Sequence, residues 1–306
     1  MQEIIKTYNL TKRYGKQKAV DNLNINVRKG DIYGLFGLDG AGKTTIVKML
    51  LGLIKPTTGI IEIFGERVSA GRYDYLKRLG ALMPYSGFYP NLTVRVNLDI
   101  HRRLMGVQEK ESIEAALSEV GLLYVKDRLF KSLCVDAKRR VGIAKALLHK
   151  PELLILDEPT VGLDPLGVKR VRQLIMDLAV KRQTTILILS ANIREIEQLV
   201  AKVGIIHQGR ILEQIDCKTF YKKNKQYLEI KVDNDKKALF VLEQYIHISN
   251  DKVVNPGIIR IYEKLNESSQ INRLLQENGV NVSEMILVNE TLEEYILKLT
   301  GGQQYD

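Results

Sequence analysis

The sequence predicts an α/β protein in which a mainly parallel sheet carries an inserted helical subdomain and is followed by a small α/β appendage. Two observations indicate this fold. Short apolar runs alternate with helical patterns up to about residue 215, as in parallel sheets whose strands are joined by helices. Beyond about residue 217 the texture changes, and shorter strand-like and helix-like segments follow a polar stretch.

Apolar runs supply the expected strands of the main sheet. They are residues 32–36, 153–156, 185–189 and 203–206. Runs this short and apolar fit strands that are buried on both faces. Between about 88 and 150 the pattern turns helical, with 113–120 and 141–148 the clearest helices. We interpret that span as a helical subdomain inserted between strands of the sheet.

The C-terminal region is expected to form a separate small domain. Lys222, Lys223, Asn224 and Lys225 have the composition of a polar linker. Strands are then expected at 227–232, 258–262 and 280–288, and helices at 271–278 and 291–299. We therefore expect one domain over 1–216 and an accessory domain over 217–306. No catalytic motif is found in the accessory domain.

Cysteine content and hydropathy indicate in which compartment the protein works. The 306 residues include only two cysteines, Cys134 and Cys217, which suits a reducing compartment. No stretch reaches the roughly 18 consecutive apolar residues of a membrane-spanning helix, and the start lacks the apolar segment of a signal peptide. We expect a cytoplasmic chain whose link to a membrane depends on a partner.

The chain has a net charge of +10, and a basic surface could bind nucleic acid or anionic lipid. Small basic clusters occur at Arg102-Arg103, Lys138-Arg139-Arg140 and Lys222-Lys223, and none has the interleaved aromatic residues of a nucleic-acid groove. We interpret the excess as scattered solvated charge and expect no nucleic-acid partner.

A glycine-rich motif follows the first apolar run. It fits G-x-x-x-x-G-K-[ST] at every fixed position and precedes an expected helix at 45–53. Glycines let backbone N–H groups turn toward phosphates, and the N-terminus of the helix adds positive potential. The residues expected to bind the nucleotide here are Gly37, Asp39, Gly40, Ala41, Gly42, Lys43, Thr44 and Thr45.

Four side chains have distinct expected roles in this site. Lys43 would reach the β- and γ-phosphates, and the hydroxyl of Thr44 would bind Mg²⁺. The apolar run 153–156 ends in Asp157 and Glu158. Asp157 would hold Mg²⁺ through its coordination shell, while Glu158 could polarise the attacking water as the catalytic base. ATP and Mg²⁺ are the expected ligands.

These motifs, with Pro159-Thr160 and 162–165 after them, resemble the ATP-binding subunits of ABC transporters over residues 1 to about 215. The resemblance implies a P-loop NTPase core of the ABC ATPase type. It places Tyr14 where the family stacks an aromatic ring on adenine, and Asp164 where a loop bridges two subunits. It also implies two partners, a polytopic membrane subunit and a second ATPase subunit, at the inner face of the cell membrane.

A finer resemblance concerns the transporter type. Residues 87–93, 291–295 and 299–302 look like those of bacterial drug and antimicrobial-peptide exporter ATPases, especially the bacitracin and lantibiotic-immunity types. The resemblance implies export of a drug, a peptide or another substrate through a separate membrane subunit.

The sequence departs from the family in the signature segment, usually Leu-Ser-Gly-Gly-Gln. Here residues 133–137 read Leu-Cys-Val-Asp-Ala. A Cys134 thiol donates weakly to phosphate, and Val135 removes the close backbone approach that glycine allows. Asp136 brings a carboxylate near an anion, which costs about 4 kcal/mol at ~4 Å and an effective dielectric of ~20 unless a neighbouring cation offsets it.

Further departures affect the chain's own site. Pro84 stands at the family's Q-loop position and has no side-chain oxygen for Mg²⁺ or water. Asn192 stands at the switch-histidine position, where it can donate one hydrogen bond to the γ-phosphate but cannot carry charge. Because the glycine-rich motif and Asp157 match the family, nucleotide binding is expected to be intact. Because the residues that would contact the γ-phosphate depart from it, hydrolysis by the isolated chain is expected to be slow or absent.

Alternative assemblies remain open. The chain could pair with a different ATPase subunit that supplies an intact signature, or form a homodimer in which the altered segment takes another shape.

Docking on the membrane subunit is expected near 85–91, where Phe88 and Tyr89 suit a groove for a partner helix. The alternative function is a nucleotide-gated regulatory subunit with little turnover. The single P-loop and the lack of long insertions argue against a ribosome-associated ABC ATPase.

Overall fold

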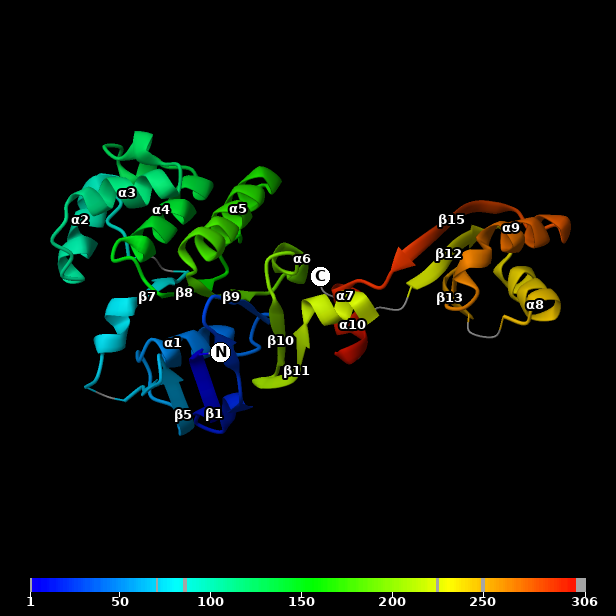
Figure 1. The fold of residues 1–306 in the computed structure, drawn as a ribbon, viewed down its shortest axis with the longest axis horizontal. Helices are drawn as coiled ribbons and strands as arrows, with labels where there is room; N and C mark the ends of the chain where they lie inside the picture. The colour runs from blue at the N-terminus through cyan, green and yellow to red at the C-terminus, as the bar shows by residue number, and fades with distance from the viewer. Residues whose placement is uncertain (1, 70, 85–86, 224–225, 249–250, 301–306) are drawn as a thin grey trace. The chain divides into compact units, whose positions relative to one another are not determined.

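The fold is taken from a computed structural model, which describes residues 2–69, 71–84, 87–223, 226–248 and 251–300. The chain divides into two compact units, with the change between Lys218 and Thr219. Figure 1 shows the first unit in blue to yellow-green and the second in yellow to red. Each unit is described by itself below.

A six-stranded sheet forms the centre of the first unit, in the order β11-β10-β4-β9-β8-β7. Its strands are β4 (Ile32–Phe36), β7 (Leu79–Leu82), β8 (Leu153–Asp157), β9 (Thr185–Ser190), β10 (Lys202–His207) and β11 (Arg210–Asp216). All neighbours pair in parallel except β11, which runs antiparallel to β10 at the edge. The four strands predicted from apolar runs are confirmed.

A second, antiparallel sheet was not anticipated from the sequence. Its strands are β1 (Glu3–Tyr14), β2 (Gln17–Leu23), β3 (Asn26–Arg28), β5 (Thr58–Ile63) and β6 (Glu66–Arg67). Helix α1 (Lys43–Leu50) packs between the two sheets, because buried Ile46 and Met49 share one core with Ile5 of β1 and Ile155 of β8. This helix begins two residues before the predicted position 45.

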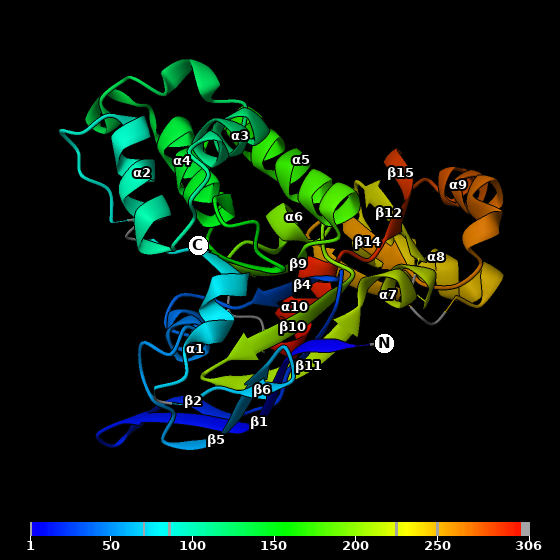
Figure 2. The same ribbon diagram turned by 60° about the vertical axis from the view of Figure 1, so that its left-hand side comes forward.

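The predicted helical subdomain contains three α-helices, α2 (Val94–Leu104), α3 (Glu111–Glu119) and α4 (Val135–Leu147). Both views place it on the opposite side of the central sheet from β1 and β5 (Figure 1, Figure 2). Thr93 caps α2 by accepting from the backbone of Val96. Helix α4 begins six residues before the predicted position 141. Helices α5 (Pro165–Arg182) and α6 (Ile193–Ile196) follow β8 and β9.

The second unit is a β-α-β-β-α-β arrangement whose four antiparallel strands have the order β13-β14-β12-β15. Its elements are β12 (Gln226–Val232), α8 (Asp235–Ile246), β13 (Asp251–Asn255), β14 (Ile258–Ile261), α9 (Ser268–Glu277), β15 (Val282–Asn289) and α10 (Leu292–Leu299). The predicted strands and helices are confirmed, while α8 and β13 were missed. Its core unites Leu228 and Ile230 with Leu242 and Ile271.

The prediction of a linker at 222–225 is wrong for its first half. Helix α7 (Cys217–Lys223) includes Lys222 and Lys223, whereas Asn224 and Lys225 lie outside the described residues. Within the second unit, the ring of Phe220 meets that of Tyr295 edge to face, with centroids 5.3 Å apart. Helix α7 therefore continues through two residues where the lysine-rich sequence suggested a linker.

In the parts of the chain that the structure describes, no helix combines the length and apolar character needed to cross a bilayer.

Candidate nucleotide-binding site

A cavity of about 480 Å³ opens where β4 and β8 end. It is lined by residues 17–19 of β2, by the loop and start of α1, by Pro84, by the two carboxylates at the end of β8 and by Gln208. Asp39, Gly40, Gly42, Lys43, Thr44, Thr45, Asp157 and Glu158 are the predicted site residues among them. The carboxyl ends of parallel strands are where α/β sheets place their ligands.

The loop before α1 depends on glycine at specific positions. Gly42 has φ of 105°, and a Cβ there would collide with the carbonyl oxygen of Ala19. Gly40 has φ of 79°, again in the left-handed region. A Cβ at Gly37 would lie 2.5 Å from the carbonyl oxygen of Ile206. The glycines therefore permit both the curvature of the loop and its close packing.

Two predicted site residues support the loop without lining the cavity. The N–H of Gly37 donates to the carbonyl of Ser190 at 3.2 Å. The N–H of Ala41 donates to Leu38 O at 3.1 Å, and its carbonyl accepts from Gly209 N at 3.0 Å. These bonds fix the loop to β9 and to the turn between β10 and β11. The side chain of Asp39 is fully exposed at the rim.

Lys43 is the buried cation of the site, with only 6% of its side chain exposed. Its Nζ donates to the carbonyls of Gly37 at 2.5 Å and Leu38 at 3.4 Å. It also lies 3.2 Å from Oε1 of Glu158, in an ion pair that is not aligned as a hydrogen bond. The lysine is thus held within the loop and its charge is balanced by Glu158.

Asp157 is buried and only half satisfied. Its Oδ2 accepts from the hydroxyl of Thr44 at 3.4 Å, whereas its Oδ1 has no hydrogen-bond partner among the described residues. Burial raises the pKa of Asp157, and the neighbouring Glu158 raises it further against the opposing effects of Thr44 and Lys43. A hydroxyl and a buried carboxylate oxygen without a donor are the hard oxygen ligands that Mg²⁺ prefers. The donor set fits this cation.

Glu158 takes a backbone conformation that side chains rarely adopt, with φ of 50°. Its N–H donates to Leu189 O at 2.9 Å, so the pairing of β8 with β9 holds this turn in place. The turn directs the carboxylate back to Lys43, where it lines the cavity.

The comparisons with known proteins agree with this geometry. Residues 20–161 match the family described as ABC transporter. The bacitracin transport ATP-binding protein BcrA of Bacillus licheniformis is 49% identical over 99% of both chains.

The chain belongs to the ABC transporter family.

Other relatives of this ABC cassette agree. The lantibiotic transport ATP-binding protein SrtF of Streptococcus pyogenes is 39% identical over 68% of this chain and 89% of that one. The structure of cbiO1 from Clostridium perfringens, part of the ABC transporter complex cbiONQ, has a TM-score of 0.66 at 24% identity and covers 81% of this chain and 98% of that one, which shows the fold. The chain is the ATP-binding subunit of an ABC transporter, a type that binds Mg·ATP and works with membrane subunits.

Two predicted contacts of the cassette lie away from the cavity lining. Tyr14, at the end of β1, is half exposed, and Lys12 Nζ lies 5.2 Å from its ring centroid. The side chain of Asn192 caps α6 by accepting from Arg194 N at 3.1 Å, and its amide donates to Glu195 at 3.1 Å. In this structure both polar atoms of the Asn192 side chain are hydrogen-bonded to residues of α6.

The signature segment differs from its electrostatic expectation. Asp136 lies in the first turn of α4 and accepts from Arg140 Nε at 3.1 Å and from Arg170 Nη1 at 3.3 Å. These two cations offset the carboxylate, so the unscreened cost of about 4 kcal/mol does not apply to it. The exposed Val135 remains at the N-terminus of the helix in place of glycine.

Several lining residues were missed by sequence reasoning. They are Gln17, Lys18, Ala19 and Gln208, together with Leu38 inside the motif. The first three lie ahead of the motif and the fourth about 165 residues after it, and none belongs to a recognisable pattern. They line one cavity only because of the way the antiparallel sheet packs with the central sheet. Pro84 does line the cavity, whereas part of the expected docking loop, residues 85–86, lies outside the described residues.

Proposed function

We propose that this cassette drives the export of an antimicrobial peptide of the bacitracin or lantibiotic class through a separate polytopic membrane subunit. The support is the identity of 49% over nearly the whole length of a bacitracin transport ATP-binding protein, including the C-terminal unit. In this role the chain sits as a peripheral protein on the inner face of the cell membrane.

The main support for a Mg·ATP site is the buried Oδ1 of Asp157. This oxygen has no hydrogen-bond donor among the described residues, although Thr44 and Lys43 lie nearby. In the proposed site, Thr44 and Asp157 hold Mg²⁺, and Lys43 and the loop amides hold the phosphates. Bound Mg²⁺ would neutralise charge on the phosphates. Once Lys43 has moved to the phosphates, Glu158 is free to accept a proton from water.

We also propose slow hydrolysis in the isolated chain and pairing with a second ATPase subunit. Pro84 offers no side-chain ligand within the cavity, and Asn192 is occupied at α6. Val135 replaces a glycine at the surface that would meet a partner's nucleotide. A different partner subunit with an intact signature would complete the site around Lys43. In a homodimer, both sites would lack those donors.

A binding measurement tests the site directly. Calorimetry of the purified chain should show ATP binding that weakens strongly when Mg²⁺ is removed. The lack of any Mg²⁺-dependent affinity, alone or in the assembled complex, would refute the site.

Cells that carry the chain with its membrane subunit should gain resistance to bacitracin or to a lantibiotic, and Lys43→Ala should abolish the gain. Equal resistance with Lys43→Ala would refute the transport role.

Counting subunits decides the assembly. Co-purification with the membrane complex, followed by mass spectrometry, should recover a second and different ATPase chain. Recovery of this chain alone, with full ATPase activity in the complex, would contradict the heteromeric pairing and leave a homodimer.

A further inference from the structure

Positive charge is concentrated at the tip of the hairpin that β1 and β2 form. Residues 4–20 contain no Asp or Glu, whereas their cations are Lys6, Lys12, Arg13, Lys16 and Lys18. Residues 40–61 contain no Asp or Glu either, and they run beside the hairpin, because Thr57 N donates to Thr11 O at 2.8 Å. The two stretches that meet at this tip therefore supply no carboxylate to balance its cations.

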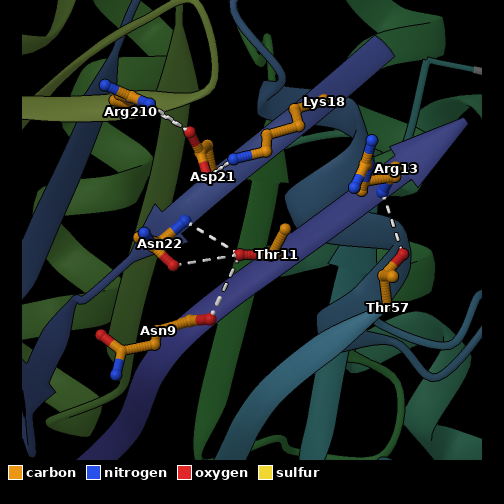
Figure 3. Close-up of polar contacts among 8 residues, drawn as sticks. All are labelled: Asn9, Thr11, Arg13, Lys18, Asp21, Asn22, Thr57 and Arg210. Carbon is orange, nitrogen blue, oxygen red and sulfur yellow. Dashed lines mark hydrogen bonds and ion pairs between the residues drawn. The ribbon is translucent and has the colours of Figure 1, made fainter. Parts of the chain in front are cut away.

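Lys55 lies beside the cations of the hairpin. Lys12 Nζ donates to the carbonyl of Lys55 at 2.7 Å. Arg13 N donates to the hydroxyl of Thr57 at 3.0 Å (Figure 3). These two bonds hold the two stretches together. Arg13, Lys16 and Lys55 are exposed, and Lys12 is partly exposed. We call Lys12, Arg13, Lys16 and Lys55 the hairpin patch.

The one carboxylate of β2 is already occupied. Asp21 is almost fully buried and accepts from Lys18 at 2.9 Å and from Arg210 at 2.8 Å. Figure 3 shows these two cations on either side of it. Lys18 is the cross-strand partner of Arg13, a position in which like charges repel, and Asp21 offsets the charge of Lys18 alone. Among the described residues, no carboxylate forms an ion pair with a residue of the hairpin patch.

Adjacent cations on α2 are balanced differently. Arg102 and Arg103 both form ion pairs with Asp99, at 2.8 Å each. Lys126, near the same helix, pairs with Glu114 at 2.8 Å. Such pairs leave little net charge on the surface. The hairpin patch is therefore an exception to the scattered, solvated charge that composition alone suggested.

The hairpin patch lies on a projecting turn. Gly15, between the cations of the two strands, has φ of 58°, and a Cβ there would meet no atom within 4 Å. None of the four patch residues is among those that line the nucleotide cavity. A small anion is bound where several donors converge in a concave site. Cations dispersed over a projecting turn fit a broad anionic surface instead.

We propose that the hairpin patch contacts anionic lipid headgroups at the inner face of the membrane. The inference rests on the proposed peripheral position of the chain. A cytoplasmic leaflet carries a negative surface potential, and each Lys or Arg near it strengthens binding by about fivefold. This attraction decays over about 8 Å at physiological ionic strength, so only cations that project from the fold can use it. The patch would add a lipid contact to the contact with the membrane subunit.

Sedimentation with vesicles tests this contact on the full chain. The vesicles consist of phosphatidylcholine alone or of phosphatidylcholine with an equal part of phosphatidylglycerol, which is anionic. The chain should bind only the anionic vesicles, and binding should weaken as salt is added. The triple variant Lys12→Gln, Arg13→Gln and Lys16→Gln should lower the partition coefficient by about 100-fold, as expected for three cations. Unchanged partition of this variant, or equal binding to neutral vesicles, would overturn the inference.

A matched control removes the same charge from other exposed positions. Lys29→Gln, Lys150→Gln and Lys169→Gln together should keep most of the vesicle binding. A loss as large as that of the patch variant would show that only net charge matters, and would overturn the assignment to the patch. ATP affinity reports folding of both variants, since neither set lines the cavity. If the triple patch variant fails this check, Lys16→Gln alone should lower partition by about fivefold.

Two other outcomes would assign the patch to a different partner and overturn the inference. The first is failure of the triple patch variant to assemble with the membrane subunit in nanodiscs of phosphatidylcholine alone, which indicates a protein contact. The second is tighter binding of the unaltered chain to a DNA duplex than to anionic vesicles at the same salt concentration. Vesicle binding without any gain of resistance in cells would instead refute the proposed transport role and leave the lipid contact standing.

Discussion

The segments that precede α1 and α4 both lead into the N-terminus of a helix, yet their backbones have different conformations. Before α1, Gly40 and Gly42 have φ of 79° and 105°, so the chain curls and directs N–H groups inward. Before α4, Cys134 is an ordinary extended residue with φ of −67°, and Val135 follows it. A helix N-terminus favours anions in both cases, but only the glycine loop can wrap one.

The two segments also balance their charges differently. Near α1, the buried cation Lys43 faces the carboxylate of Glu158, which a phosphate can displace. Near α4, the carboxylate of Asp136 is held by Arg140 and Arg170 within the same subunit. The first arrangement can exchange a protein anion for a ligand anion, whereas the second is closed on itself. This difference supports the proposal that the cassette binds its own nucleotide through the loop before α1 and contributes less to the nucleotide of a partner.

The largest effect is expected from Lys43→Ala, which removes the cation from the first segment. Nucleotide affinity should fall by about 100-fold, because a charge-assisted contact to the phosphates is lost and Glu158 is left without its ion pair. Titration with a fluorescent ATP analogue measures this. Lys48→Ala, on the exposed face of the same helix, is the control and should bind normally. Unchanged affinity of Lys43→Ala would remove the assignment of the site.

The next effect concerns turnover. Glu158→Gln should lower ATP hydrolysis by at least about 100-fold in the assembled complex, since the proton acceptor is gone, while ATP affinity is kept. Phosphate release in the presence of the partner subunits reports the rate. Glu152→Gln, which disrupts an ion pair with Arg78 at the other end of β8, should leave the rate unchanged. Undiminished hydrolysis by Glu158→Gln would exclude Glu158 as the base.

Substitutions in the segment before α4 test whether it lacks only the donors and the open backbone that the loop before α1 has. The triple substitution Cys134→Ser, Val135→Gly and Asp136→Gly should raise ATP-dependent association about tenfold, because a hydroxyl donor and an open backbone are restored. Sedimentation with Mg·ATP and a hydrolysis-deficient background measures association. No gain would mean that this segment lies outside the subunit interface. Arg170→Ala alone should not reproduce the gain.

The smallest effect is on folding stability. Asp157→Asn should raise the free energy of unfolding of the ligand-free chain by about 1 kcal/mol at neutral pH, because a buried carboxylate oxygen without a donor is costly. Since the folded-state pKa of Asp157 is raised, the unaltered chain should recover this difference as pH falls through that pKa. Urea unfolding at pH 7 and at lower pH checks the sign. A less stable variant at pH 7 would contradict the unsatisfied state of Asp157.

The sequence predicted the parts of the site that are contiguous. Lys43, Thr44 and Asp157 stand in short motifs whose local folding brings their side chains to the strand ends. Lys18 and Gln208 could not be predicted, because their meeting depends on how the antiparallel sheet packs on the central one. That sheet was missed because its core residues alternate with polar ones over a bulged strand, β1, rather than forming a continuous apolar run.

Long-range pairing limited the other predictions in the same way. The sequence showed that Asp136 departs from the family, but the offsetting Arg170 lies 34 residues away on α5. Helix α8 was missed because charged residues dominate its first turn, although Ala238, Val241 and Leu242 bury one face. Burial of a partly polar helix is a property of the whole unit, and local patterns report it weakly.

The contact between Lys43 and Glu158 has a consequence for the timing of the cycle. While the loop holds no phosphate, the residue proposed to activate water is engaged in an ion pair with a buried cation. Arrival of the triphosphate would draw the lysine toward the phosphates and release the carboxylate of the glutamate. The proposed base would then become available to water only after the nucleotide has bound.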